Sequence, residues 1–290
     1  MDPAVAISSS VPTVPPWLEE ICSRLRSNDA SLNNLNLNIR RLTPVSCAHL
    51  WDAIRDNSVL ETINLTNSLV PPIDLSPLMR GVINHASLKT LHLSYNKLVG
   101  VELVAAALRA NTSLENIFLD YNRIQDDAVL LANALKHNKT LKTLHLGKNQ
   151  VDDRGAIALA AMLTENQTLE WISLLSNSIQ APGLAALEDA LQQNVTLKYL
   201  EIDQNPGITL ELHNRVTQLG LANGYGRYLL RSSGTPLGLW SRVLAASGGQ
   251  ANKMYFFLKS MPELCRPCLE DGGGNDETEM QLTDWHLTHR

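Results

Sequence analysis

Two closely spaced pairs of metal-type ligands stand near the C-terminal end of this chain, as Cys265-x-x-Cys268 and His286-x-x-His289. Thiolates and imidazoles are the usual ligands of structural zinc. The His–His spacing is shorter than usual, and the 17 residues between the pairs are Gly-rich and acidic. Surface thiols and tail histidines account for the same residues. We therefore expect no metal site, and zinc stays open as an alternative.

Motifs for catalysis are missing from the sequence. It contains no phosphate-cradling Gly loop, no HExxH and no nucleophile elbow. The CxxC pair has no thioredoxin-like βαβ context. Ser, His and Asp occur, but in no spacing that is tied to a mechanism. We therefore expect no enzyme activity, no catalytic residue and no cofactor.

A repeat organises most of the chain. The frame LxxLxL occurs seven times and closes five times as LxxLxLxxN. The seven rows begin at Leu32, Leu60, Leu88, Leu114, Leu141, Leu169 and Leu197, 26 to 28 residues apart.

 The sixth row, from Leu169, keeps the same register as its neighbours. A repeated unit of this length cannot bury its own apolar face, so it must stack on copies of itself. We expect each row to start with a short strand whose side chains alternate between two faces.

Two sets of asparagines recur with the frame. One set follows each of the last five strands and is expected to form a structural ladder that pairs backbone groups of neighbouring turns. Its members are Asn96, Asn122, Asn149, Asn177 and Asn205. The other set, Asn111, Asn138, Asn166 and Asn194, should end the helices, where Asn can take the left-handed conformation. Because its N-x-S/T triplets recur at one place in the repeat, turn chemistry explains them better than glycosylation.

The row from Leu141 reads LKTLHLGKNQV and is followed by an Ala- and Leu-rich helical stretch. A unit of the form LxxLxLxxNxIxxxGxxxLaxaLxxNxt resembles the ribonuclease-inhibitor type of leucine-rich repeat, over roughly residues 17–219. The resemblance implies an α/β fold, a right-handed leucine-rich-repeat solenoid (horseshoe) with a concave parallel β-sheet and convex helices. The class also occurs in intracellular nucleotide-binding immune receptors and in the Ran GTPase-activating protein.

The strand register predicts which side chains lie on the concave face. Aromatic and histidine residues gather there in rows three to seven, although only 5% of the chain is aromatic. The expected partner-binding residues are His92, Tyr95, Phe118, Asp120, Tyr121, His145, Trp171, Leu175, Tyr199, Glu201 and Asp203. Trp and Tyr are enriched at interfaces. The alternative is that neighbouring rings stack on one another to cover the sheet.

Two further expectations concern this face. His92 and His145 share a column two rows apart, so their rings should lie roughly 10 Å from each other with Phe118 between them. That separation is too large for one metal ion. Glu201, Asp203 and Asp120 should form an acidic rim, which favours a partner that carries Lys or Arg.

The repeat frame also divides the chain. We expect a flexible segment over residues 1–15, an N-terminal capping helix over 16–31, seven repeats over 32–219, a helical C-terminal cap over 220–268 and an acidic disordered tail over 269–290. The stretch GLANGYGRY at the start of that cap is loop-like. An open stack of repeats exposes apolar surface at both ends, and the caps would cover it.

Charge and hydropathy exclude several kinds of partner. The net charge is −5, and residues 261–290 alone account for it. No basic patch emerges, so nucleic acid and anionic membranes are not expected partners. No apolar run approaches the ~20 residues that span a bilayer.

The start of the chain lacks a basic, apolar signal sequence, and the four cysteines make no disulfide framework. We therefore expect a cytoplasmic protein that is monomeric when free. Its expected function is that of a non-enzymatic protein–protein interaction module or scaffold, which binds a protein partner through the concave face. The alternative is a GTPase-activating or GTPase-regulatory protein that resembles the Ran GTPase activator.

Overall fold

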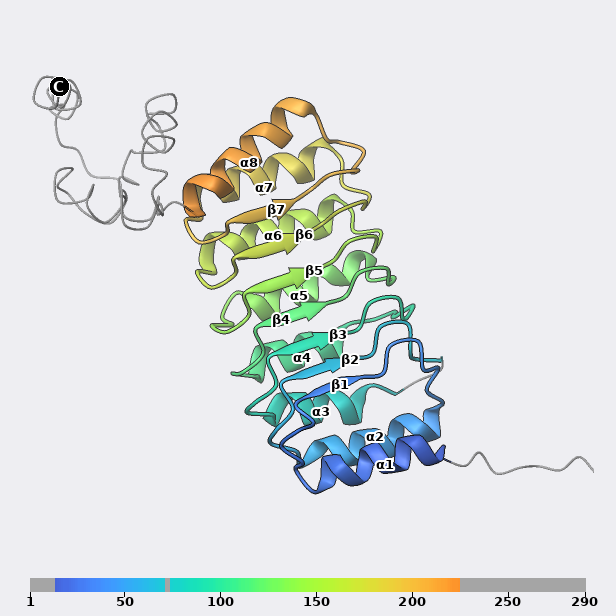
Figure 1. Ribbon diagram of the computed structural model, residues 1–290. Helices are drawn as coiled ribbons and strands as arrows, with labels where there is room; N and C mark the ends of the chain where they lie inside the picture. Colours follow the sequence, from blue (N-terminus) through green and yellow to red (C-terminus); the bar gives the residue numbers. More distant parts are fainter. Residues whose placement is uncertain (1–13, 71–73, 225–290) are drawn as a thin grey trace, which may run out of the picture. The chain divides into compact units, whose positions relative to one another are not determined.

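The computed structural model describes residues 14–70 and 74–224, all within the compact unit Met1–Tyr228. Short strands and helices alternate along this part of the chain (Figure 1). The strands are β1 (Asn34–Asn36), β2 (Thr62–Asn64), β3 (Thr90–His92), β4 (Asn116–Phe118), β5 (Thr143–His145), β6 (Trp171–Ser173) and β7 (Tyr199–Glu201). The helices are α1 (Pro16–Arg26), α2 (Pro44–Arg55), α3 (Ser76–Asn84), α4 (Glu102–Ala110), the 3-10 turn η1 (Gln125–Asp127), α5 (Ala128–Leu135), α6 (Asp153–Glu165), α7 (Ala181–Gln193) and α8 (Leu210–Gly224).

The strands form one parallel sheet in the order β1 to β7, and each pairs with the next without a register shift. Equivalent repeat positions are therefore hydrogen-bonded neighbours, for example Phe118 and His145. The helices line one face of the sheet, behind the strands in Figure 1. This arrangement confirms the predicted leucine-rich-repeat fold, with its parallel sheet on one side and helices on the other. We call the face without helices the open face.

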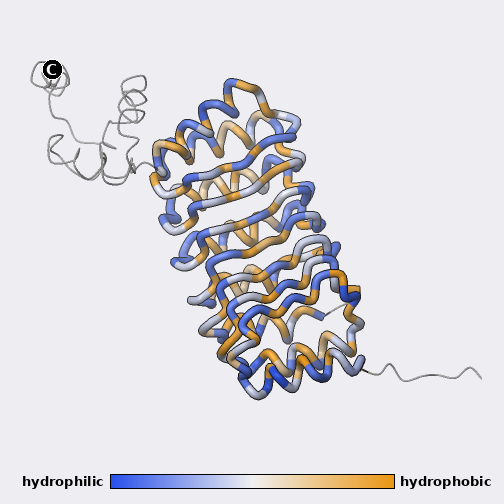
Figure 2. Tube along the Cα trace, viewed as in Figure 1, coloured by the Kyte–Doolittle hydropathy of each residue, from blue (hydrophilic) through white to orange (hydrophobic). Residues whose placement is uncertain are grey.

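The core lies between the sheet and the helices. The leucines at the third and fifth positions after each leading leucine point into it, so Leu91, Leu93, Leu144 and Leu146 are fully buried. Apolar and polar residues alternate along strands and helices accordingly (Figure 2). Successive helices approach closely where the repeat has small residues. At Gly155, for example, an added Cβ would lie 3.1 Å from the Cβ of Ala128 in the preceding helix.

The asparagines that follow the strands are buried and bond to backbone groups of two rows. Asn122 Oδ1 accepts from the N–H groups of Asn96 and Leu98, each at 3.0 Å. Its Nδ2 donates to the carbonyls of Leu93 and Leu119, at 3.1 and 2.7 Å. One side chain thus satisfies four backbone groups that would otherwise be orphaned in the core.

The asparagines at the helix ends behave differently from the expectation. Asn111, Asn166 and Asn194 have φ angles of −72°, −79° and −74°, so the predicted left-handed conformation is wrong. Each side chain instead closes a turn and reaches back to the previous repeat. Asn138 Oδ1 accepts from the N–H of Leu141 at 2.7 Å, and its Nδ2 donates to the Leu108 carbonyl at 2.6 Å. These asparagines therefore form a second ladder, in which the amides are buried rather than open to modification.

One row departs from this second ladder. His85 stands 28 residues after Asn57, which makes the ladder bonds to Leu60 and Leu25. The His85 ring is buried, its Nε2 has no hydrogen-bond partner, and burial lowers its pKa. Its folded-state pKa therefore lies below the unfolded value near 6.5.

Replacing His85 with Asn should raise the free energy of unfolding by about 1–2 kcal/mol, because a buried ring nitrogen without a partner is exchanged for the ladder amide. The folded His85 binds protons less readily than the unfolded one. Stability from its neutral form is complete above pH ~6.5 and is lost as the pH falls below that value. In His85→Asn, the free energy of unfolding should therefore fall less between pH 7.5 and pH 5 than in wild type. Urea unfolding at pH 7.5, 6 and 5 measures this. The exposed His137→Asn variant is the control, and equal pH profiles for wild type and His85→Asn would contradict the assignment.

Left-handed residues mark the end of every strand on the open face. The residue seven places after each leading leucine has a φ between 51° and 64° in all seven rows. These residues are Ile39, Asn67, Tyr95, Tyr121, Lys148, Ser176 and Gln204. The backbone N–H of Tyr121 donates to the Gly147 carbonyl at 2.8 Å, so the inter-row bonding continues through the turn. This bonding holds residues other than glycine in a conformation that they rarely adopt.

Ile39→Asn should raise the free energy of unfolding by about 1 kcal/mol. A β-branched residue is strained at the Ile39 φ of 64°, whereas Asn tolerates this region and occupies the same position in the next row as Asn67. Ile39 is 64% exposed, so little burial is lost. Denaturant unfolding measures the change, with Val45→Asn, an exposed helical residue, as the control. A loss of stability equal to that of the control would contradict the argument.

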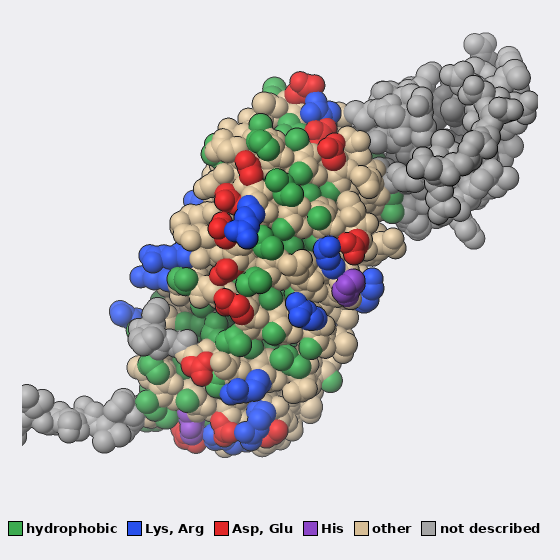
Figure 3. All heavy atoms as spheres, turned by 180° about the vertical axis from the view of Figure 1, so that it is seen from behind, with side chains coloured by type: hydrophobic (Ala, Val, Ile, Leu, Met, Phe, Trp, Pro, Cys, Tyr) green, Lys and Arg blue, Asp and Glu red, His purple; other side chains and the backbone are tan. Residues whose placement is uncertain are grey.

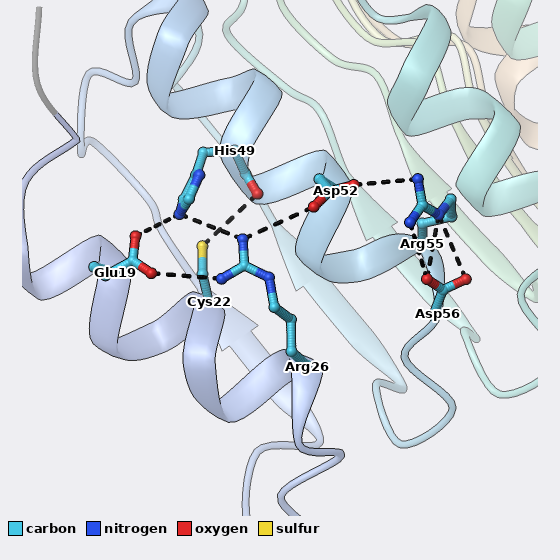
Figure 4. A network of polar contacts seen from close by, with 7 residues as sticks. All are labelled: Glu19, Cys22, Arg26, His49, Asp52, Arg55 and Asp56. Atoms are coloured by element: carbon cyan, nitrogen blue, oxygen red, sulfur yellow. Dashed lines mark hydrogen bonds and ion pairs between the residues drawn. The ribbon is translucent and has the colours of Figure 1, made fainter.

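The described residues include the first cap. Helix α1 begins with Pro16, as expected, and buries Leu18, while Trp17 is only partly buried beneath the guanidinium of Arg40. Polar contacts join α1 to α2 (Figure 4). Arg26 of α1 lies 3.4 Å from the His49 ring and 3.9 Å from the Asp52 carboxylate of α2, and Glu19 contacts His49. These contacts fix α1 on α2 and so close this end of the stack.

The last described helix extends further than expected. Residues 220–224 were predicted to start a loop, but they are helical and belong to α8. The prediction was wrong because Ala222 is buried and Asn223 donates to the carbonyls of Asn194 and Leu197, at 3.0 and 2.8 Å. The predicted flexible start over 1–13, the cap from residue 225 onward, the tail and the Cys/His pairs lie outside the described residues.

Candidate protein-interaction surface

Five rings form a continuous row across the open face, and we call them the ring column: His92, Phe118, His145, Trp171 and Tyr199. His92 stacks on Phe118 with 4.3 Å between ring centroids and 8° between planes. Phe118 and His145 are 4.7 Å apart, and Trp171 and Tyr199 are 4.8 Å apart. The spacing follows from the sheet, since paired parallel strands lie about 4.8 Å apart. Phe118 lies between the two histidines, as the register predicts.

A second row lies at the strand ends of β3, β4 and β5, and we call it the strand-end column: Tyr95, Tyr121 and Lys148. Tyr95 and Tyr121 stack with centroids 3.9 Å apart, and the Lys148 ammonium lies 4.7 Å from the Tyr121 ring. The hydrogen bond from Lys148 lowers the pKa of Tyr121, whereas donating a hydrogen bond to Tyr121 raises the pKa of Tyr95 to about 12. The Tyr95 phenol is therefore neutral at physiological pH.

Large parts of these rings remain open to solvent. The exposed fractions are 40% for Trp171, 53% for Tyr199, 46% for Tyr95 and 39% for Tyr121. His92 is half-buried, and its pKa is lowered chiefly by burial and further by the charge of His145. The rings thus cover the sheet and one another, and still present apolar edges outward. The expected stacking of neighbouring rings is present, and partner binding through them stays a prediction.

The acidic residues of the open face have partners within the molecule. Asp120 accepts from the Gly147 N–H at 2.8 Å and from the Ser94 hydroxyl at 3.4 Å, and it lies 3.6 Å from His145. Asp203 lies 2.8 Å from the His213 ring. Glu201 and Leu175 are partly buried. The structure therefore weakens the expectation of an acidic rim that attracts Lys or Arg.

Charged pairs at the strand starts were not predicted from the sequence. Lys89 pairs with Glu61 at 3.2 Å, Lys142 with Glu115 at 2.8 Å and Lys198 with Glu170 at 2.8 Å. A sequence pattern could have predicted these pairs. The residue after the leading leucine alternates between Glu and Lys from the second row to the seventh. These pairs bridge neighbouring rows, while the cations near the strand ends have no such partners.

The helical face offers a weaker case for a site. Seen from behind in Figure 3, its apolar side chains are interspersed with charged ones of both signs. Its exposed apolar residues, such as Leu103 and Ile157, come from different helices. Single exposed apolar residues are normal and need no partner. The stacked rings of the open face are therefore the more distinctive surface.

Within residues 14–70 and 74–224, no group of three His, Cys, Asp or Glu side chains is placed to hold a metal ion. No helix in those ranges is long and apolar enough to cross a bilayer. Cys22 and Cys47 are buried free thiols, and burial raises their pKa to about 11 and about 12. Both thiols are therefore poor nucleophiles and metal ligands.

Comparisons with known proteins agree with the repeat frame. The family model described as "Leucine Rich repeat" matches residues 137–160. The "NACHT, LRR and PYD domains-containing protein 9C" of Mus musculus is 30% identical over 123 residues, and "NACHT, LRR and PYD domains-containing protein 13" of Homo sapiens is 31% identical over 132 residues. These matches cover 41% and 44% of this chain, but only 12% and 13% of those proteins. Repeat, sheet and family match together identify the chain as a leucine-rich-repeat protein.

Two solved structures also match this chain over part of its length. One, titled "Leiomodin-1 Actin-Binding Site 2 (ABS2)", is 20% identical with a TM-score of 0.41, and the match covers 73% of this chain and 91% of that one. The other is the tropomodulin C-terminal domain of Caenorhabditis elegans, 16% identical with a TM-score of 0.36, covering 75% and 99%. The ribonuclease-inhibitor type of repeat remains a resemblance in the sequence.

Proposed function

We propose that this chain is a non-enzymatic protein-interaction module whose open face binds a protein partner. The observation that carries the proposal is the ring column, in which five rings with neighbouring centroids 4.3 to 5.9 Å apart lie on one face of the sheet. Trp and Tyr dominate the binding energy of many interfaces. Their edges are exposed here along one contiguous row, and contiguous exposed apolar surface is typical of interaction sites.

Self-stacking supports binding rather than competing with it. Each ring is fixed by its neighbours and by in-register strand pairing, so it loses little conformational freedom when a partner docks. Asp120 fits a positioning role better than a contact role, because it is 22% exposed and bonded to Gly147 and Ser94. Tyr95, Tyr121, Leu175 and the acids Glu201 and Asp203 complete the proposed surface.

The GTPase-regulatory alternative has less support. A shared polar cluster at the turns between strands and helices would favour it, but Lys97, Arg123, Gln150 and Ser178 vary from row to row. Binding through the open face is proposed independently of the cellular compartment. The cytoplasmic location of the protein stays a proposal from the sequence.

The test is affinity capture from cell extract with the full chain as bait and quantitative mass spectrometry as readout. Phe118→Ala/Trp171→Ala should reduce capture of the specific partner at least tenfold, which corresponds to about 1.4 kcal/mol. Stacked pairs contribute about 0.5–1.5 kcal/mol each, so the variant should melt a few degrees lower and still fold.

A matched variant on the other face is the control. Leu103→Ala/Ile157→Ala removes two exposed apolar residues from α4 and α6 and should leave capture unchanged. Equal capture by wild type and by the ring-column variant would refute the open face as the binding site.

A further inference from the structure

The strand-end edge of rows three to five carries three exposed cations from successive rows: Lys97, Arg123 and Lys148. The backbone N–H of Arg123 donates to the Leu98 carbonyl at 2.9 Å, which joins the third and fourth rows at this edge. Lys148 belongs to the strand-end column beside Tyr121. These cations therefore border the stacked rings along β3, β4 and β5, in the middle of the sheet (Figure 1).

Among the ion pairs of the described residues, none involves these three cations. The cations at the strand starts, by contrast, are paired with glutamates of the preceding row. The nearest acids along the chain are engaged elsewhere or set back from the rings. Asp126 lies 3.6 Å from Arg154, and with Asp127 it lines a hollow of about 280 Å³ beside Arg123.

Two of the open-face acids are engaged by neighbouring groups. Asp120 is held by Gly147 and Ser94, and Asp203 by His213. The surface thus combines exposed rings with an unpaired basic edge, a combination that favours a partner with apolar and acidic side chains.

Building on the proposed function, we propose that the partner docks through an acidic extended segment. Its carboxylates face Lys97, Arg123 and Lys148, and its apolar side chains contact the ring column. Side chains of an extended peptide alternate between two sides, so one segment can direct carboxylates to the basic edge and apolar side chains to the rings.

A polyanionic nucleic acid fits less well. Single-stranded nucleic acids bind by stacking bases on free aromatic faces. In the ring column those faces are taken by neighbouring rings, with centroids as close as 4.3 Å. A protein segment needs only the exposed edges and the basic side chains.

The test selects binders to the full chain from a random twelve-residue peptide library and measures the best one by fluorescence anisotropy. The selected peptides should be enriched in Asp and Glu. Lys97→Gln/Arg123→Gln/Lys148→Gln should weaken binding at least tenfold. The exposed cations Arg109 and Lys139 provide the control, since Arg109→Gln/Lys139→Gln should change affinity less than twofold.

The outcomes separate this inference from the proposed function. If Phe118→Ala/Trp171→Ala weakens peptide binding and the three-cation variant does not, the open face is supported as the binding site and the acidic segment is refuted. If neither variant weakens binding, both the open-face site and the acidic segment are refuted. A library without an excess of acidic binders overturns the inference, and so does full competition by a single-stranded RNA twelve-mer. Circular dichroism and melting confirm that each variant is folded.

Discussion

Asn122→Ala should lower the free energy of unfolding by about 3–5 kcal/mol, the largest single-residue effect that we expect. The amide is buried and joins two rows through four backbone groups, those of Asn96, Leu98, Leu93 and Leu119. Alanine leaves all four without a partner in the core, at about 1–3 kcal/mol for a fully unsatisfied group. The expected loss is smaller than the sum over the four groups, because the structure relaxes partially and water reaches some of them.

Urea unfolding followed by circular dichroism measures this change. Asn122→Asp is a second test, because it keeps an acceptor oxygen but places a carboxylate against two carbonyl groups. At neutral pH it should lower the free energy of unfolding at least as much as Asn122→Ala. Asn38→Ala, at an exposed position of the first row, should stay within about 0.5 kcal/mol of wild type. A similarly small effect at Asn122 would show that the ladder contributes little to stability.

Gly220→Ala should lower the free energy of unfolding by about 3 kcal/mol. Glycine within a helix is normally about 1 kcal/mol worse than alanine, so the same change in an isolated helix would stabilise. At Gly220 an added Cβ would lie 2.3 Å from the Lys198 carbonyl oxygen at the start of β7. Backbone must shift to admit it, and overpacking of this kind costs about 1–3 kcal/mol.

A second helical glycine provides the matched control. At Gly81 in α3, an added Cβ would come no closer than 4.0 Å to the Arg55 Cα. Gly81→Ala should therefore raise the free energy of unfolding by about 0.5–1 kcal/mol. Thermal and urea unfolding measure the change in stability of both variants. Stabilisation by Gly220→Ala would place residues 220–224 in an unpacked segment, as the sequence predicted.

The sequence determined the repeat and most of what the repeat imposes. Counting from each leading leucine places every strand and predicts which side chains share the open face, because strand periodicity and in-register stacking are local and repeated. The observed pairing of Phe118 with His145, and of Trp171 with Tyr199, follows from that count. The start of α3 at Ser76 follows equally from the prolines before it.

The tertiary structure decided the features that depend on contacts between rows. Whether Asn138 turns left-handed or bonds to Leu108 depends on a carbonyl one repeat away. Whether Asp120 is a free rim acid depends on Gly147 in the next row. The length of α8 likewise depends on Asn223 reaching Asn194 and Leu197. Each contact joins residues about 26 to 30 positions apart, so local sequence propensity cannot predict it. Only the stacking of the repeats brings the partners together.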